Sequence, residues 1–97
     1  MQVAGFDWDR GNLAKCAKHG VPHWEIEGLL RAGPAVAPDM AHSSHKQRFV
    51  AVGRNAGGRP LFVAFTVRER GGLRLIRPIS ARYMHKKEIE AYEKKGS

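Results

Sequence analysis

The stretch LFVAFTVRERGGLRLIRPI, at residues 61–79, decides the fold. It opens with an unbroken apolar run over 61–67, which is typical of a central strand of a sheet. Two consecutive glycines follow this run and predict a tight turn, and apolar residues return over 73–79. Pro78 has no backbone N–H to donate, so a bulge or an unpaired position is expected there. The stretch therefore predicts an antiparallel hairpin at the centre of a sheet.

Further strands are expected before this hairpin. The segment RFVAVG at 48–53 has the composition of a strand, and NAGG at 55–58 is a turn signal that separates it from the hairpin. A shorter strand over 35–38 is bordered by prolines, which confine it to an edge of the sheet. The polar segment 39–47 is typical of a loop. Three or four antiparallel strands are thus expected.

Two helices are expected before the strands in the sequence and one after them. The first runs from residue 10 to about residue 18, is capped by Asp9, and buries one side made by Leu13, Ala14 and Ala17. The second has Pro22 in its first turn and buries a stripe made by Ile26, Leu29 and Leu30. A third, amphipathic helix is expected over 85–94.

This order of elements predicts an α+β fold with two N-terminal helices, a three- to four-stranded antiparallel sheet and a C-terminal helix. Helices on one face of a hairpin-connected sheet make two layers and leave the other face open for a ligand. A chain of 97 residues has room for one core, so residues 1–97 are expected to form a single domain.

The chain is strongly basic. Its 17 lysines and arginines outnumber its 9 aspartates and glutamates, which gives a net charge of +8. Such a charge attracts polyanions, and nucleic acid is the commonest polyanion in the cytosol. Arginine is the more frequent of the two basic residues and suits bidentate contacts to phosphate. The balance favours a phosphate-bearing ligand over the plainer interpretation, a basic domain whose charge has no specific role.

The single cysteine and the N-terminus bear on where the protein works. Cys16 excludes an internal disulfide and a zinc site of several thiolates, and its apolar-spaced surroundings predict a buried, inert thiol. The N-terminus lacks the apolar run of a signal peptide, and no stretch has the ~18 apolar residues of a membrane span. A cytoplasmic protein without membrane contact is therefore expected.

The histidines do not follow a metal-binding pattern. His42 and His45 lie three residues apart in the expected loop, with one acidic residue nearby. His19 and His23, four residues apart, also lack the acidic residue and the third ligand of a helical zinc site. The segment AGG at 56–58 is not followed by the Lys-Ser or Lys-Thr of a phosphate-binding loop. No metal site and no cofactor are predicted.

Arginines on the strands are the remaining candidates for chemistry. Arg48 opens one strand and Arg68 closes another. Arg77 lies on the last strand and Arg82 follows it. Neighbouring strands of a hairpin bring such side chains close, so they can grip a backbone phosphate and stabilise a pentacoordinate transition state without a metal ion. The plainer interpretation is a solvated polar face.

Cleavage at a phosphate also needs proton carriers. One group must take the proton from a ribose 2′-hydroxyl, and another must give a proton to the leaving 5′-oxygen. The available candidates are His19, Lys18 and His42. Carboxylates are scarce in the middle of the chain, which favours an Arg/His/Lys site over a pair of carboxylates. Ser80 has no partnered base in the sequence and is expected to hold the strand end by hydrogen bonding.

Several short motifs occur in a recognisable order along the chain. In the first half they are Phe6, Trp8-Asp9, Asn12 and KHGV at 18–21. In the second half they are His42-Ser43, Arg48-Phe49, Gly53, Gly58-Arg59 and ISAR at 79–82, followed by Glu88 and Tyr92. Together, in this order and at this chain length, the motifs resemble the BrnT family of toxins.

The resemblance implies a RelE-like α+β fold and cleavage of RNA. It also implies neutralisation by a BrnA-type ribbon-helix-helix antitoxin in a two-plus-two complex, which binds promoter DNA through the antitoxin. One departure concerns the residues before Arg48, where the family often has acids and this chain has Lys46-Gln47. If one of those acids is the usual general base, this chain uses another group or is weakly active.

The leading hypothesis is a metal-independent ribonuclease toxin. Arg48 and Arg82 bind and stabilise the scissile phosphate. His19 or Lys18 moves protons, with His42 as the alternative from the loop.

Three more basic residues are expected to bind RNA phosphates, namely Arg68, Arg77 and Lys15. Arg82 also has a structural alternative, an ion pair with Glu88 of the closing helix. Two other functions stay open: a non-catalytic RNA- or DNA-binding module of the same fold, and a plain interaction protein. The binding module is disfavoured because the phenylalanines lie in apolar runs and leave few exposed rings for base stacking.

Overall fold

The hairpin expected at residues 61–79 forms, and it is longer than expected. β4 (Pro60–Arg70) pairs antiparallel with β5 (Leu73–Tyr83). The turn between them consists of Gly71 and Gly72, both in the left-handed region with φ of 58° and 79°. The expected end of the last strand at residue 79 is wrong, because β5 continues to Tyr83. Arg82 therefore lies in the strand and not after it.

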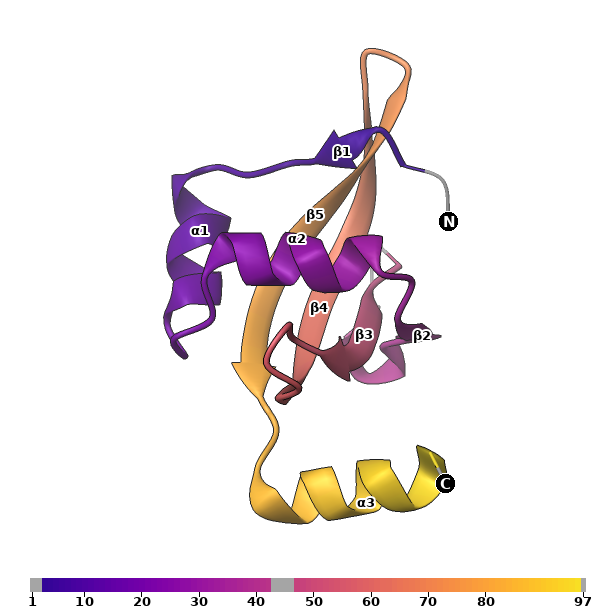
Figure 1. The fold of residues 1–97 in the computed structure, drawn as a ribbon. Helices are drawn as coiled ribbons and strands as arrows, with labels where there is room; N and C mark the ends of the chain where they lie inside the picture. The colour runs from indigo at the N-terminus through magenta and orange to yellow at the C-terminus, as the bar shows by residue number, and fades with distance from the viewer. Residues whose placement is uncertain (1–2, 43–46, 97) are drawn as a thin grey trace.

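The computed structural model describes residues 3–42 and 47–96, and this part of the chain forms a five-stranded mixed sheet (Figure 1). Its other strands are β1 (Gly5–Phe6), β2 (Ala35–Pro38) and β3 (Phe49–Arg54), and the order is β1-β5-β4-β3-β2. β2 lies at an edge, as its prolines predict. The four strands β2 to β5 pair antiparallel as expected, but a fifth strand, β1, which was not predicted, runs parallel to β5. Two residues are too few to show the alternation that reveals a strand.

Pro78 produces the expected irregularity in the hairpin. Ala64 pairs with Ser80 and Phe65 pairs with Pro78, so Ile79 is an extra residue in β5. The carbonyl oxygen of Pro78 accepts a hydrogen bond of 2.8 Å from the Asn12 side chain. The bulge is thus the point at which β5 is joined to the N-terminal helix.

The first helix, α1 (Arg10–Ala17), begins as predicted but buries a different side. Asp9 is the N-cap: its carboxylate accepts from the Asn12 N–H at 3.0 Å, and the Asn12 side chain accepts from the Asp9 N–H at 2.7 Å. Asn12 and Cys16 are buried, whereas the expected buried side is exposed, namely Leu13, Ala14 and Ala17. The prediction fails because a polar side chain makes the contact with β5, and apolar spacing cannot reveal such a contact.

The other helices lie close to their expected places. α2 (His23–Arg31) begins just after Pro22, which is its N-cap, and it buries Ile26 and Leu29. A short 3-10 helix, η1 (Met40–His42), occupies the start of the segment expected to be a loop. α3 (Lys86–Gly96) closes the chain.

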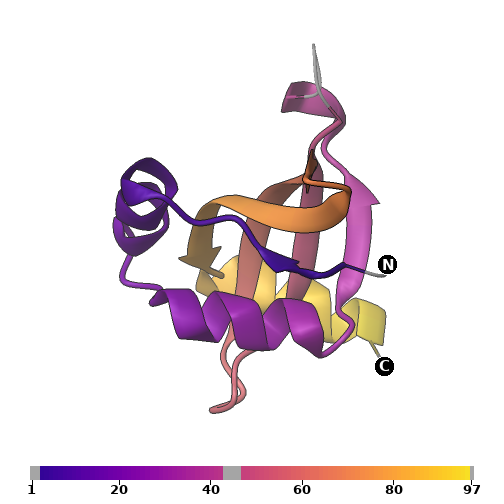
Figure 2. The same cartoon turned by 90° about the horizontal axis from the view of Figure 1, so that it is seen from above.

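The helices are arranged around the sheet so that one face stays open. α2 lies across one face, α1 flanks β5, and α3 lies beyond the end at which β5 stops (Figures 1 and 2). The core between α2 and the sheet is built from Ile26 and Leu29 together with alternate strand residues, among them Ala51, Val63 and Ala81. Since strand side chains alternate between faces, the neighbours of these residues point to the side that α2 does not cover.

Candidate active site

A cleft of about 340 Å³ lies on the face of the sheet opposite α2. Its floor is one row of side chains across three strands, in which Val50 pairs with Ala64 and Ala64 with Ser80. Two of the three side chains are small, so the row is lower than its surroundings. The pairing register sets these small side chains in one row, next to the bulge at Ile79.

His19 forms the wall of the cleft on the side of β5. It follows α1, which the Asn12–Pro78 hydrogen bond ties to the bulge of β5. Gly20, with φ of 80°, then turns the chain toward α2. His19 is exposed, so its imidazole is accessible to a ligand in the cleft.

Asp39 contributes to the cleft from the side of β3. It follows β2, and its backbone N–H donates to the Arg48 carbonyl at 2.7 Å. Its carboxylate Oδ2 lies 3.4 Å from Nε of Arg48, and the Asp39 side chain is 15% exposed. Arg48 therefore reaches the edge of the cleft through its ion pair with Asp39.

Arg82 closes one end of the cleft and also anchors α3. Its guanidinium lies 4.7 Å from the ring centroid of Phe62, the residue opposite it on β4. Two parallel hydrogen bonds of 2.8 and 2.9 Å join it to the Glu88 carboxylate. These bonds raise the pKa of Arg82 and, together with the His85 N–H, lower the pKa of Glu88 to about 2. Arg82 therefore both pairs with Glu88 of α3 and lines the cleft.

The remaining predicted basic residues lie outside this cleft. Lys15 and Lys18 are exposed on α1 and at its C-cap. Arg68 is half-buried on β4 and lines a separate hollow with Arg70 and Arg74. Nε of Arg68 is buried without a hydrogen-bond partner within the described residues. The side chain of His42 lies outside what the structure describes.

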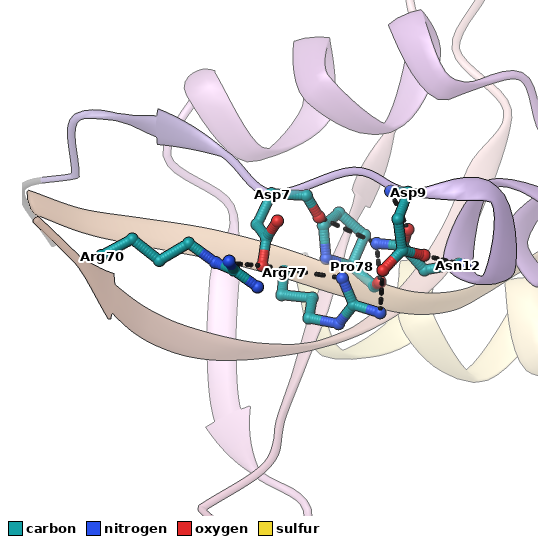
Figure 3. A network of polar contacts seen from close by, with 6 residues as sticks. All are labelled: Asp7, Asp9, Asn12, Arg70, Arg77 and Pro78. Carbon is teal, nitrogen blue, oxygen red and sulfur yellow. Dashed lines mark hydrogen bonds and ion pairs between the residues drawn. The ribbon is translucent and has the colours of Figure 1, made fainter.

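Arg77 belongs to a polar network at the start of α1 (Figure 3). It binds Asp9 at 2.8 Å and lies 3.6 Å from Asp7, which Arg70 also contacts at 3.3 Å. The pKa of Asp9 is lowered, first by the Asn12 backbone N–H and then by Arg77. These contacts engage Arg77 in holding the N-terminal segment on β5.

Two features were not predicted, one in the cleft and one outside it. Asp39 was assigned no role, although the edge strand before it places it beside Arg48. Trp24 lies on α2, outside the cleft, and is 68% exposed, so its ring is available to stack on a base. The position of Trp24 in the first turn of α2, outside the apolar stripe of that helix, could have indicated an exposed ring.

Among the described residues, no three side chains of His, Cys, Asp or Glu gather in a way that could hold a metal ion. No helix in the same part of the chain is long and apolar enough to cross a membrane.

Comparison with protein families gives one match. The model described as the ribonuclease toxin BrnT of a type II toxin–antitoxin system matches residues 8–88. The chain belongs to the BrnT family. A comparison with curated proteins found no match. As a BrnT ribonuclease toxin, the protein has RNA as its substrate and an antitoxin as its partner. The matched segment includes His19, Asp39 and Arg82, which line the cleft, and Arg48 beside Asp39.

Proposed function

We propose that this BrnT toxin cleaves RNA in the cleft between His19 and Arg82, without a metal ion. The observation that carries the proposal is the shared cleft, which places an exposed imidazole and a guanidinium over one concave floor. An arginine held by two hydrogen bonds to Glu88 is preorganised, so it can stabilise the charge that develops on the phosphate without rearranging.

The reaction proposed is attack of the ribose 2′-oxygen on the adjacent phosphorus. The 2′-O–P bond forms, the P–O5′ bond breaks, one proton leaves the 2′-hydroxyl and one is added to the 5′-oxygen. The products are a 2′,3′-cyclic phosphate and a 5′-hydroxyl. His19 is the proton carrier that the cleft supports best, and Lys18 and His42 remain the alternatives.

The other arginines are proposed to bind RNA outside the scissile phosphate. Arg48 extends the basic edge of the cleft through its contact with Asp39. Arg68, with its unpartnered Nε, is suited to a neighbouring phosphate in the hollow that it lines. Lys15 is exposed and can approach the same strand of RNA. Arg77 is the weakest of these assignments because Asp7 and Asp9 already engage its guanidinium.

The test is cleavage of a defined RNA by the purified toxin in excess chelator. Arg82→Ala should lower the rate by about 10²–10³-fold, the usual cost of one preorganised donor. Glu88→Gln is the matched comparison, because it keeps the guanidinium and weakens the bonds that hold it, so the rate should fall less than in Arg82→Ala. Cleavage that stops in chelator and returns with one divalent ion would disprove the metal-independent mechanism. Equal losses in both variants, with equal falls in melting temperature, would make Arg82 structural.

The partner is proposed to be a BrnA-type ribbon-helix-helix antitoxin in a two-plus-two complex, with promoter DNA bound through the antitoxin. The toxin, residues 1–97, is proposed to act as one RelE-like domain. Its net charge of +8 suits an acidic inhibitory segment. Expression of the toxin alone should arrest growth, and the partner should restore it. The mass of the purified complex tests the stoichiometry.

Trp24 favours one other function, a non-catalytic RNA-binding module. An exposed indole can stack on a base, and such stacking contributes about 1–3 kcal/mol. A module of this kind binds RNA without producing cyclic phosphate ends, so the cleavage assay separates the two functions.

A further inference from the structure

Two titratable side chains enter the cleft from opposite sides. His19 comes from the side of β5, and Asp39 comes from the side of β3. The floor between them, Val50, Ala64 and Ser80, spans three strands. Three adjacent strands cover about 10 Å, which is wide enough for a phosphate group and its two ester oxygens.

This opposed arrangement fits the chemistry of a phosphodiester. The attacking and leaving oxygens lie roughly in line on opposite sides of the phosphorus in the transition state. A base and an acid can therefore act on the same phosphate only if they reach it from two sides. Arg82, on β5, also lines the cleft, where it can contact the non-bridging oxygens.

We infer that Asp39 is the general base of this toxin and His19 its general acid, an assignment that rests on the proposed ribonuclease function. Asp39 takes the proton of the 2′-hydroxyl while the 2′-oxygen bonds to phosphorus. The P–O5′ bond breaks with its electron pair on the 5′-oxygen, which takes a proton from the His19 imidazolium.

Arg48 is the positioning residue for this base. Its Nε lies 3.4 Å from the Asp39 carboxylate, and its carbonyl accepts the Asp39 N–H at 2.7 Å. The backbone hydrogen bond fixes the position of Asp39, and the ion pair with Arg48 orients its carboxylate. Arg48 is the charged group beside Asp39 in the ion pair, and the Arg82–Glu88 pair lies at the end of the cleft. A carboxylate is thus supplied by position 39, although the residues before Arg48 are Lys46-Gln47.

Two substrates distinguish a base from an acid. The first is a uridylyl-adenosine dinucleotide, whose 5′-oxygen needs a proton as it leaves. The second is uridine 3′-(4-nitrophenyl phosphate), whose nitrophenolate leaves without one. With both substrates the full-length toxin is assayed as wild type, Asp39→Asn, Asp39→Glu, His19→Ala and, as a control, Glu90→Gln from the exposed face of α3.

The expected result is a different pattern for each carrier. Asp39→Asn should lower kcat/KM by about 10²–10⁴-fold on both substrates, the usual contribution of a general base. It should also abolish the acidic limb of the pH–rate profile, and Asp39→Glu should restore part of the rate. His19→Ala should lose a similar factor on the dinucleotide and less than about tenfold on the nitrophenyl ester. Glu90→Gln should behave as wild type.

Three results would overturn the assignment. One is wild-type activity of Asp39→Asn, and another is rescue of Asp39→Asn by the nitrophenyl ester. The third is a loss of activity in Asp39→Asn that follows a fall in melting temperature and leaves the acidic limb in place. A wild-type toxin that cleaves neither these substrates nor a longer RNA would instead refute the ribonuclease function proposed for the cleft.

Discussion

Replacing Asn12 by alanine should destabilise the protein more than an alanine at any other position of α1. Asn12 is 4% exposed and is the one fully buried polar side chain among the described residues. Its amide donates to the carbonyls of Pro78 and Asp7 at 2.8 and 2.9 Å, and its oxygen accepts from the Asp9 N–H at 2.7 Å. Alanine removes all three hydrogen bonds and introduces no substitute.

The magnitude follows from the burial of these groups. A buried polar group left without a partner costs about 1–3 kcal/mol, and loss of a helix cap costs about 1 kcal/mol. Together they predict a loss of about 3 kcal/mol for Asn12→Ala. In a domain of this size 1 kcal/mol shifts the melting temperature by about 4–8 °C, so a fall of about 12–24 °C is expected.

Urea unfolding followed by tryptophan fluorescence measures this loss directly. Leu13→Ala, at the neighbouring and partly exposed position, is the control and should cost less than about 1 kcal/mol. Asn12→Asp should be at least as damaging as Asn12→Ala, since it keeps the acceptor but brings a carboxylate against two carbonyl oxygens. A loss below about 0.5 kcal/mol for Asn12→Ala would show that these bonds do not hold α1 on β5.

Three further predictions concern the core and the ion pair of α3. Gly53→Ala should lower the free energy of unfolding by about 1–3 kcal/mol in thermal melts, because its methyl would lie 2.6 Å from a leucine of α2. The control Gly28→Ala meets nothing within 4 Å and should raise the free energy of unfolding by up to about 1 kcal/mol. Cys16 should not react with Ellman's reagent at pH 8 until the chain unfolds, since burial raises the pKa of its thiol to about 11; rapid labelling of folded protein would contradict this. The lowered pKa of Glu88 means that its pairing with Arg82 stabilises the fold above about pH 4.5 and is lost as pH falls toward about 2. The stability difference between wild type and Glu88→Gln should therefore be constant above about pH 5 and shrink below it, and a difference that persists at pH 2 would exclude this linkage.

The parts of the fold that were predictable are those with a strong local signal. The hairpin follows from the apolar run and from Gly71 and Gly72, and the bulge follows from the missing donor of Pro78. β1 could not be predicted because its pairing partner lies 70 residues away and nothing in Gly5–Phe6 alternates. The buried side of α1 was missed for a related reason: its main contact is the Asn12 amide, which looks like a surface residue in a hydrophobicity pattern.

The residue types that line the candidate cleft could be predicted in part, but the distances between them could not. Basic residues on strand ends indicated a phosphate ligand, and His19 and Arg82 do share a cleft. The carboxylate partners of the arginines were harder to foresee because they come from other elements. Only the Arg82–Glu88 pair was considered from the sequence, since both residues lie near the same strand end. The pairing of Arg77 with Asp9 depends on the docking of α1, which no local pattern reveals.

The attachment of α1 to the β5 bulge also determines when the toxin can fold. The Asn12–Pro78 hydrogen bond joins residues 66 positions apart, and β1 must likewise wait for Leu75. Ribosomes add about 5–20 residues per second, so the N-terminal segment is made about 3–13 s before its partner strand. Pairing between such distant residues is also slow in itself, because the entropy cost of closing a long loop precedes any stabilising contact. Ser80 and Arg82 are on that same late strand. The cleft of a newly made toxin is therefore incomplete until β5 has been synthesised. An antitoxin already in the cell has several seconds in which to reach the nascent chain before the cleft forms.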